Sequence, residues 1–129
     1  MKKRKLITVA IDSPAAAGAG TQAKLIAKNY NLIHLDTGRI YRFIGKINLD
    51  ASKKINYNYL KKKIKNLKIN YLKNKNLLSD RVATSASIIA KKKKIRSLVH
   101  KFQKKYAYSP PLKYSGSVLD GRDITSIQM

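Results

Sequence analysis

The chain has 129 residues, a length that fits one domain with a core of moderate size. It contains no cysteine, which excludes disulfide frameworks and thiolate metal sites, and its two histidines lie too far apart in sequence for a local metal motif. The 29 Lys and Arg residues against six acids give a net charge of +23, which fits a polyanionic partner, although solvated lysine is the commonest outcome of such a composition.

The beginning of the chain has the order of a secretory signal but not its length. A basic run at 2–5 precedes the apolar stretch 6–11, which Asp12 interrupts after six residues. A signal needs about 7–15 apolar residues and a membrane span about 18, and no later stretch approaches that length. We therefore expect a cytoplasmic protein that makes no contact with a membrane.

An alternation of strands and helices is predicted over the first third of the chain. The apolar run 6–11 predicts a strand buried on both faces of a parallel sheet, and the small residues 13–21 predict a loop. Apolar residues at helical spacing predict a helix over 23–30, a second run predicts a strand over 32–35, and the helical spacing returns over 40–47. This order implies parallel strands joined by crossovers.

The middle of the chain, residues 48–78, is rich in Lys, Asn and Tyr and is the least informative stretch. Apolar spacing there predicts one short helix over 60–67, and the run 69–72 predicts a short strand. The segment fits either an inserted subdomain or a solvated connection.

The last third again shows helical spacing followed by an apolar run. Helices are predicted over 82–89 and 95–102, separated by four lysines at 91–94. The prolines at 110–111 end the helical region, and a third strand is predicted over 117–119.

Three loops follow the three predicted strands, so we expect them to meet at one edge of the sheet, where open α/β folds bind ligands. The first loop compares with the phosphate-binding pattern G-x-x-x-x-G-K-[ST], with Ser13 at the first Gly position, Gly18 at the second and Ala19 at the Lys position. Taken alone, this altered motif fits a small-residue turn equally well.

Four ordered segments resemble the bacterial cytidylate kinase family. Residues 11–21 read I-D-S-P-A-A-A-G-A-G-T against the family's I-D-G-P-x-x-x-G-K-G-T, and residues 35–42 read L-D-T-G-R-I-Y-R against L-D-T-G-x-x-Y-R. Residues 86–103 are similar to its A-S-x-x-A, V-R and Q-R elements, and residues 119–124 read L-D-G-R-D-I against D-G-R-D-[IM]. Four of the six acids fall inside these segments: Asp12, Asp36, Asp120 and Asp123.

The resemblance implies a P-loop kinase-type three-layer α/β fold with a parallel sheet, and a nucleoside monophosphate-binding insertion at about 48–90. It implies transfer of the ATP γ-phosphoryl group to CMP or dCMP, with Mg²⁺ as cofactor but no dedicated metal-ligating residues. A monomer is expected, and nucleic acid is not the expected partner. The ATP-binding residues implied are Ser13, Pro14, Ala15, Ala16, Ala17, Gly18, Ala19, Gly20 and Thr21.

A second set of residues matches the family's CMP-binding positions. Arg42 and Arg122 would act as catalytic arginines at the acceptor phosphate, where a planar guanidinium binds in a bidentate manner. Asp123 would accept from the cytosine amino group, while Ser87 and Arg96 would donate to the ring acceptors. The full set implied is Asp36, Thr37, Gly38, Arg42, Ser87, Arg96, Arg122 and Asp123.

Two departures from the family pattern change what we expect. Ala19 supplies no charge to the transferred phosphoryl group, and removing one positioned donor costs about 10²–10³-fold in rate unless a residue such as Lys24 replaces it. The family continues beyond the position of Met129 with further strands and a lid, so we expect residues 1–129 to be the N-terminal part of a single domain. The fold would be incomplete at the C-terminus, marginally stable and inactive alone.

Two other functions stay open. The charge, together with tyrosines interleaved among the lysine runs, fits a small basic nucleic-acid-binding protein. The loss of the loop lysine at Ala19 fits a remnant that binds nucleotide without catalysis.

Overall fold

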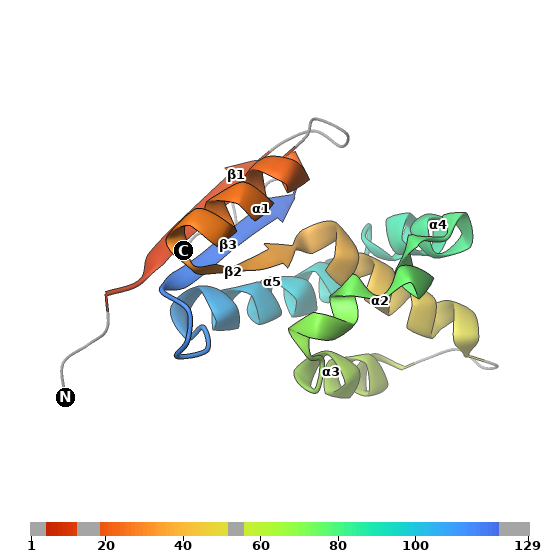
Figure 1. Cartoon of the computed structure of the whole chain (residues 1–129). Coiled ribbons are helices and arrows are strands. Elements are labelled where there is room, and N and C mark those ends of the chain that lie inside the picture. The colour runs from red at the N-terminus through yellow and green to blue at the C-terminus, as the bar shows by residue number, and fades with distance from the viewer. Residues whose placement is uncertain (1–4, 13–18, 52–55, 122–129) are drawn as a thin grey trace. The chain divides into compact units, whose positions relative to one another are not determined.

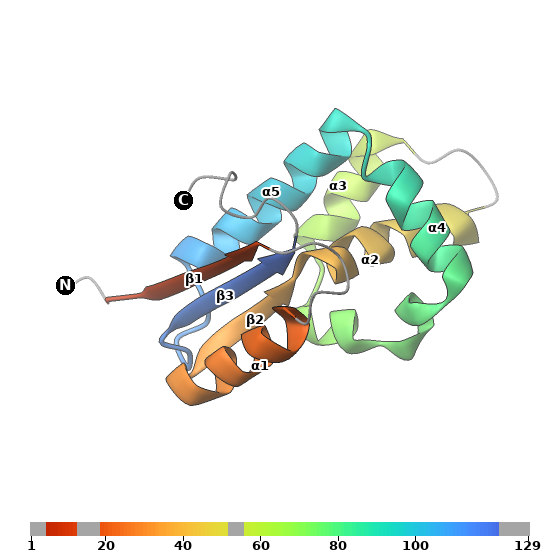
Figure 2. The ribbon, with the colours of Figure 1, turned by 90° about the horizontal axis from the view of Figure 1, so that it is seen from above.

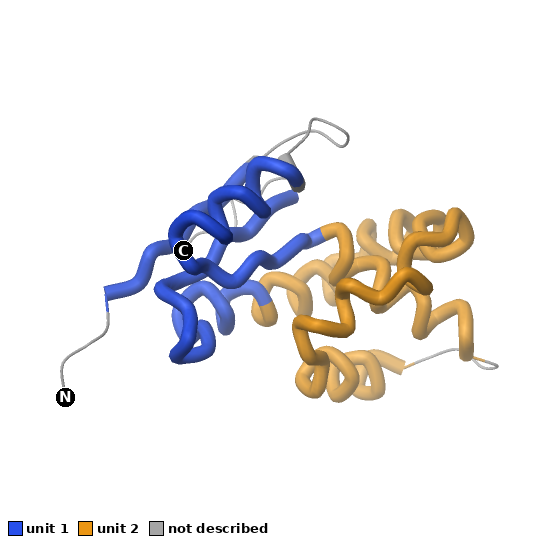
Figure 3. The backbone as a smooth tube through the Cα atoms, in the orientation of Figure 1, with its two compact units in different colours: residues 1–37, 103–129 blue, residues 38–102 orange. Residues whose placement is uncertain are grey.

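The computed structural model describes residues 5–12, 19–51 and 56–121 (Figure 1). The chain divides into two compact units, one formed by residues 1–37 with 103–129 and the other by residues 38–102 (Figure 3). They are called unit 1 and unit 2 below, and each is described by itself.

Unit 1 contains a parallel sheet of β1 (Ile7–Asp12), β2 (Leu32–Asp36) and β3 (Gly116–Gly121). The strand order is β1-β3-β2, so the last of the three described strands in the sequence lies in the middle (Figure 2). All three strands are predicted from the apolar runs, and the structure confirms both their existence and their parallel direction.

The burial of the strands differs from the prediction in one respect. The expectation that the run 6–11 is buried on both faces is wrong, because Ile7 is 44% exposed and Thr8 is also exposed. Within the described sheet β1 pairs only with β3, whereas β3 is flanked on both sides and is buried from Gly116 to Asp120. Strand β2 is also paired on one side only in the described sheet but is largely buried, so pairing alone does not account for the exposure of β1.

Helix α1 (Ala19–Tyr30) covers one face of this sheet, and the end of α5 belonging to unit 1 lies on the other face (Figures 1 and 2). Ala23 of α1 forms a core with Leu32 and Val118, against which Ile26 and other apolar residues pack. The residue after the helix is Asn31, whose positive φ of 55° is tolerated by Asn better than by most side chains. Helix and strands thus give unit 1 its layers.

Unit 2 is helical. Its elements are α2 (Thr37–Asp50, with its first residue in unit 1), α3 (Tyr57–Lys65), the 3₁₀ turns η1 (Ile69–Lys73) and η2 (Lys75–Leu78), α4 (Asp80–Ile89) and the first part of α5 (Lys93–Tyr108). Helices α3 and α4 each have a side-chain N-cap. The Asn56 side chain accepts a hydrogen bond from Tyr59 N–H, and the Ser79 hydroxyl accepts one from Val82 N–H.

The short strand predicted over 69–72 is wrong, because these residues form the 3₁₀ turn η1. Backbone N–H groups bond three residues back, from Tyr71 to the Lys68 carbonyl at 2.9 Å and from Asn74 to the Tyr71 carbonyl at 3.0 Å. These turns satisfy the backbone hydrogen-bonding groups locally, so the segment does not need a neighbouring strand to pair with.

Helices α2 and α4 approach each other closely at Gly45. A Cβ atom at this position would lie 2.8 Å from the Ala86 backbone nitrogen, so only glycine lets the two backbones come this near. The buried Ser85 hydroxyl donates to the Gly45 carbonyl oxygen at 3.0 Å. Both features fix the α2–α4 packing inside unit 2.

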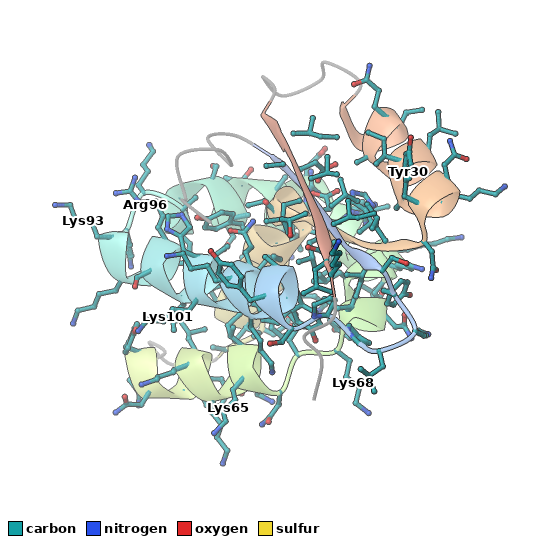
Figure 4. The ribbon with its side chains drawn as sticks, turned by 90° about the vertical axis from the view of Figure 1, so that its left-hand side faces the viewer. Tyr30, Lys65, Lys68, Lys93, Arg96 and Lys101 are labelled. Atoms are coloured by element: carbon teal, nitrogen blue, oxygen red, sulfur yellow. The ribbon has the colours of Figure 1, made fainter. Side chains whose placement is uncertain are left out.

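Most of the positive charge lies in unit 2. Residues 38–102 hold 19 of the 29 Lys and Arg residues but only two acids, Asp50 and Asp80. Figure 4 shows labelled side chains such as Lys65 and Lys93 extending outward. Asp50 pairs with Lys46 at 2.6 Å. Other lysines lie over aromatic rings instead: Lys63 is 5.5 Å from the Tyr59 ring and Lys94 is 5.6 Å from the Tyr57 ring.

Candidate active site

The carboxyl ends of the three strands meet at one edge of unit 1. In the register of the sheet, Asp120 lies beside Ile11 on one side and beside Asp36 on the other, and Asp12 lies beside Gly121. Strand ends carrying three of the four motif aspartates therefore converge, as the parallel order predicts. The loop residues Ser13, Pro14, Ala15, Ala16, Ala17 and Gly18, and the motif residues Arg122 and Asp123, lie outside the described residues.

The N-terminus of α1 follows this edge in the sequence. The helix begins at Ala19 and Gly20, and Thr21 is exposed in its first turn. Free backbone N–H groups and the helix dipole make such an N-terminus favourable for a phosphate group. Lys24, considered above as a substitute for the missing loop lysine, is exposed on the same helix.

Two contacts between polar side chains involve residues at or next to these strand ends in unit 1. His34 and Asp120 are in contact, with 3.1 Å between Nε2 and Oδ2, and their side chains are 19% and 6% exposed. Gln103, which is fully buried, donates from Nε2 to the hydroxyl oxygen of Thr37, the residue that follows Asp36. The hydrogen bond holds Thr37 in place at the start of α2.

The predicted catalytic arginine of unit 2, Arg42, is hydrogen-bonded to a backbone carbonyl of the same unit. Arg42 is half-buried, and its guanidinium donates to the Leu77 carbonyl oxygen at 2.9 Å. The neighbouring Arg39 donates to the Leu72 carbonyl oxygen at 3.3 Å. These bonds join α2 to the 3₁₀ turns and restrict where the Arg42 side chain lies, while leaving other guanidinium N–H groups for a ligand.

The predicted cytosine-reading residues of unit 2 lie at its surface. Ser87 is exposed, and its hydroxyl donates to the Thr84 carbonyl oxygen at 2.9 Å. Arg96 is exposed on α5. Burial raises the pKa of the Tyr41 phenol, and the positive charge of Arg96 partly offsets the rise, so these two side chains are near enough to interact.

The structure thus separates the predicted site residues into two groups. Thr21, Asp36 and Thr37 belong to unit 1, and Gly38, Arg42, Ser87 and Arg96 belong to unit 2. Their assembly around one pair of nucleotides stays a prediction, as does the role of the 48–90 segment, which falls inside unit 2.

Sequence reasoning did not predict the contacts of these residues, although Tyr41 and Gln103 lie inside the family-like segments 35–42 and 86–103. His34, Gln103 and Tyr41 contact or neighbour motif residues through tertiary structure, over separations of up to 86 residues. The histidine inside the apolar run 32–35 could have indicated the contact with Asp120, because an imidazole in a buried strand needs a polar partner.

Two further observations apply to the described residues only. None of their helices is long and apolar enough to cross a bilayer. Their His and Asp side chains form no group of three or more that would hold an ion.

A parallel sheet followed directly by a helix N-terminus, with carboxylates at the same edge, is the arrangement of phosphate-binding α/β proteins. The cytidylate kinase family model matches residues 9–129. A cytidylate kinase of Rhodopseudomonas palustris (strain TIE-1) is 38% identical over 120 residues, which cover 92% of this chain and 55% of that protein.

More distant relatives agree. A cytidylate kinase of Azorhizobium caulinodans is 36% identical over 119 residues, with 92% of this chain and 56% of that protein covered. One of Methylobacterium sp. (strain 4-46) is 33% identical over 122 residues, covering 94% and 56% respectively. The chain belongs to the cytidylate kinase family and has its P-loop kinase-type α/β fold. It spans about half the length of the curated relatives it matches.

Proposed function

We propose that this chain is part of an enzyme that transfers the γ-phosphoryl group of ATP to CMP or dCMP and acts in the cytoplasm, where these nucleotides occur. The observation that carries the proposal is the family match over residues 9–129, together with the convergence of Asp12, Asp36 and Asp120 at one sheet edge. A phosphoryl transfer needs both nucleotides positioned in line and the charge between them neutralised.

Each unit would contribute its own residues. In unit 1, the loop 13–18 and the N-terminus of α1 would bind the ATP phosphates through backbone N–H groups. In unit 2, Arg42 would bind the CMP phosphate with the guanidinium N–H groups that Leu77 does not use. Ser87 and Arg96 would donate to the cytosine ring, with Arg122 and Asp123 completing the phosphate and base contacts.

The residues at the unit 1 edge fit a magnesium ion. Mg²⁺ keeps several waters and takes one or two protein oxygens plus substrate phosphates, so a large cluster of carboxylates is not required. Asp120 Oδ1 is buried and has no hydrogen-bond partner among the described residues, and the Thr21 hydroxyl is exposed in the first turn of α1. Asp120 and Thr21 would hold the ion, which when bound neutralises charge on the phosphates.

Calorimetric titration of the chain with CMP, dCMP and UMP tests this proposal. We expect binding of CMP or dCMP at least about 10-fold tighter than binding of UMP, because the carbonyl at position 4 of uracil leaves an acceptor such as Asp123 unpaired. Tight binding of a single-stranded oligonucleotide without cytidine preference would instead favour a basic nucleic-acid-binding protein.

The loop residue Ala19 separates an enzyme from a non-catalytic nucleotide-binding protein. In a protein extended to the length of its relatives, we expect Ala19→Lys to raise the rate of CMP-dependent ADP formation by about 10²-fold or more, since it restores one positioned charge. An unchanged rate at measurable activity would mean that another cation already serves. CMP binding without turnover in both proteins would favour the remnant.

A further inference from the structure

The contact between His34 and Asp120 is a directional hydrogen bond on one face of the unit 1 sheet. Asp36 is the register partner of Asp120, so His34, two residues earlier on β2, points to the same face as both aspartates. The distance from Nε2 to Oδ2 is 3.1 Å, and the two residues are 86 positions apart in sequence. An ionised carboxylate only accepts, so the imidazole donates from Nε2.

This bond leaves one carboxylate oxygen of Asp120 for a ligand. The terminal torsion of an aspartate is broad, so without a partner the two oxygens exchange places easily. With Oδ2 bound to His34, the other oxygen, Oδ1, is buried and unpaired among the described residues. A buried acceptor left unpaired is destabilising, and a bound donor or cation would remove that penalty.

We propose that His34 is a positioning residue for metal-nucleotide binding: it orients the Asp120 carboxylate so that Oδ1 stays available to the hydrated magnesium ion that accompanies ATP. This inference rests on the proposed function. Histidine suits the role because it can donate a hydrogen bond while uncharged, whereas Lys or Arg at position 34 would place a fixed positive charge beside the cation. Hydrogen bonds to metal-binding carboxylates act in this way in other proteins.

Two substitutions of His34 test the bond. His34→Leu fills similar space without a donor, whereas His34→Gln keeps an N–H group at a similar reach, and His100→Gln in unit 2 is the matched control. ATP affinity is measured by calorimetry on the 129-residue chain, once with Mg²⁺ and once with a chelator. We expect His34→Leu to weaken binding about 10-fold with Mg²⁺ but leave metal-free binding within about 2-fold, since loss of an outer partner typically costs 10–100-fold.

The pattern across variants decides between positioning and simple structural support. We expect His34→Gln to recover most of the Mg²⁺-dependent affinity and His100→Gln to bind as the unsubstituted chain does. Equal losses with and without Mg²⁺, no loss in His34→Leu, or no recovery in His34→Gln would each overturn the inference. If His34→Leu fails to fold, the comparison of His34→Gln with the unsubstituted chain and the spectra below decide it.

Ring spectra test the contact without relying on nucleotide binding. The chain has only two histidines, so His100→Gln assigns both imidazoles in ¹H–¹⁵N NMR. We expect the His34 Nε2 signal to shift in Asp120→Asn and in the presence of Mg²⁺ with ATP. A His34 signal unchanged by Asp120→Asn overturns the inference. Absence of any ATP binding by a protein extended to the length of its relatives, with that shift present, would reject the proposed function and with it the metal-positioning role, while leaving the contact itself established.

Discussion

The two units differ in where their few carboxylates lie. In unit 1, Asp12, Asp36 and Asp120 lie at strand ends, and Asp120 is buried against a histidine. In unit 2 there are two acids among 65 residues, and lysines such as Lys63 and Lys94 lie over tyrosine rings. Such cation–π contacts contribute about 0.5–1 kcal/mol each at exposed sites. Lys105 and Lys113 of unit 1 also lie over tyrosine rings, so the cation–π contacts are common to both units. The units differ in that three acids of unit 1 lie at the candidate site.

The largest expected effect tests how strongly unit 1 depends on its central strand. A Cβ atom at Gly116 would overlap the Ile7 carbonyl oxygen, so Gly116→Ala should separate β1 from β3 and lower the free energy of unfolding by about 3 kcal/mol. Urea unfolding measures the loss, and hydrogen exchange should show β1 amides exposed while α4 amides in unit 2 keep their protection.

Ser117→Ala is the control for that change, one residue along the same strand. The Ser117 hydroxyl is buried and unpaired among the described residues, so its removal should be neutral or stabilising. A mild effect of Gly116→Ala would contradict the close approach of β1 and β3 at this position. Loss of protection in both units together would contradict an effect confined to unit 1.

The next effect concerns the α2–α4 contact of unit 2. Gly45→Ala places a Cβ atom against the Ala86 backbone and should lower the free energy of unfolding by about 1–3 kcal/mol. Ser85→Ala removes only the hydrogen bond to the Gly45 carbonyl and should cost about 1 kcal/mol. Hydrogen exchange of α4 amides measures both, and equal protection in Gly45→Ala and the unsubstituted chain would disprove the close approach.

A smaller effect tests the charge of unit 2. Lys61 and Lys65 are exposed one turn apart on α3, so they repel, whereas Glu at position 61 would attract Lys65. We expect Lys61→Glu to raise the free energy of unfolding by about 0.5 kcal/mol at low salt, and the gain to shrink at about 1 M salt because of screening. Lys61→Gln should give about half the gain, and a loss of stability in Lys61→Glu would refute the argument.

The smallest effect is a pH dependence carried by Tyr41. Burial raises its pKa above the ordinary value of 10.0, so the native state holds this proton more tightly than the unfolded state. The contribution of the protonated Tyr41 to the free energy of unfolding is fully present below pH 10.0 and is lost as the pH rises through the native pKa. Between about pH 9 and pH 11, Tyr41→Phe should therefore lose less stability than the unsubstituted chain in urea unfolding, and equal losses would argue against burial as the cause.

Local patterns predicted most of the elements, and tertiary pairing explains what they missed. Apolar spacing located the helices, because a buried face recurs at the helical period whatever it packs against. The same method failed at 69–72, where a short apolar run fits a strand or a turn equally well. It also misjudged the burial of β1, since an apolar run does not report what packs on each face of its strand.

The candidate site shows the same difference between what local patterns predict and what tertiary contacts add. The motif segments gave Asp36, Thr37 and Arg42 from sequence, but not the contacts that hold Thr37 and Arg42. The contacts of Asp120 with His34 and of Thr37 with Gln103 join residues separated by 86 and 66 positions, and no periodicity reports such pairs. The roles of the motif residues stay predictions.

The central place of β3 has a consequence for how the chain acquires its structure during synthesis. Strands β1 and β2 are hydrogen-bonded to β3 and not to each other, so their facing edges remain unpaired until residues 116–121 have left the ribosome. By then every residue of the helical unit has emerged, and its contacts are closer together in sequence, which favours early folding. The pairing of β1 and β2 must therefore wait for β3, and chaperones that shield open strand edges would act in that interval.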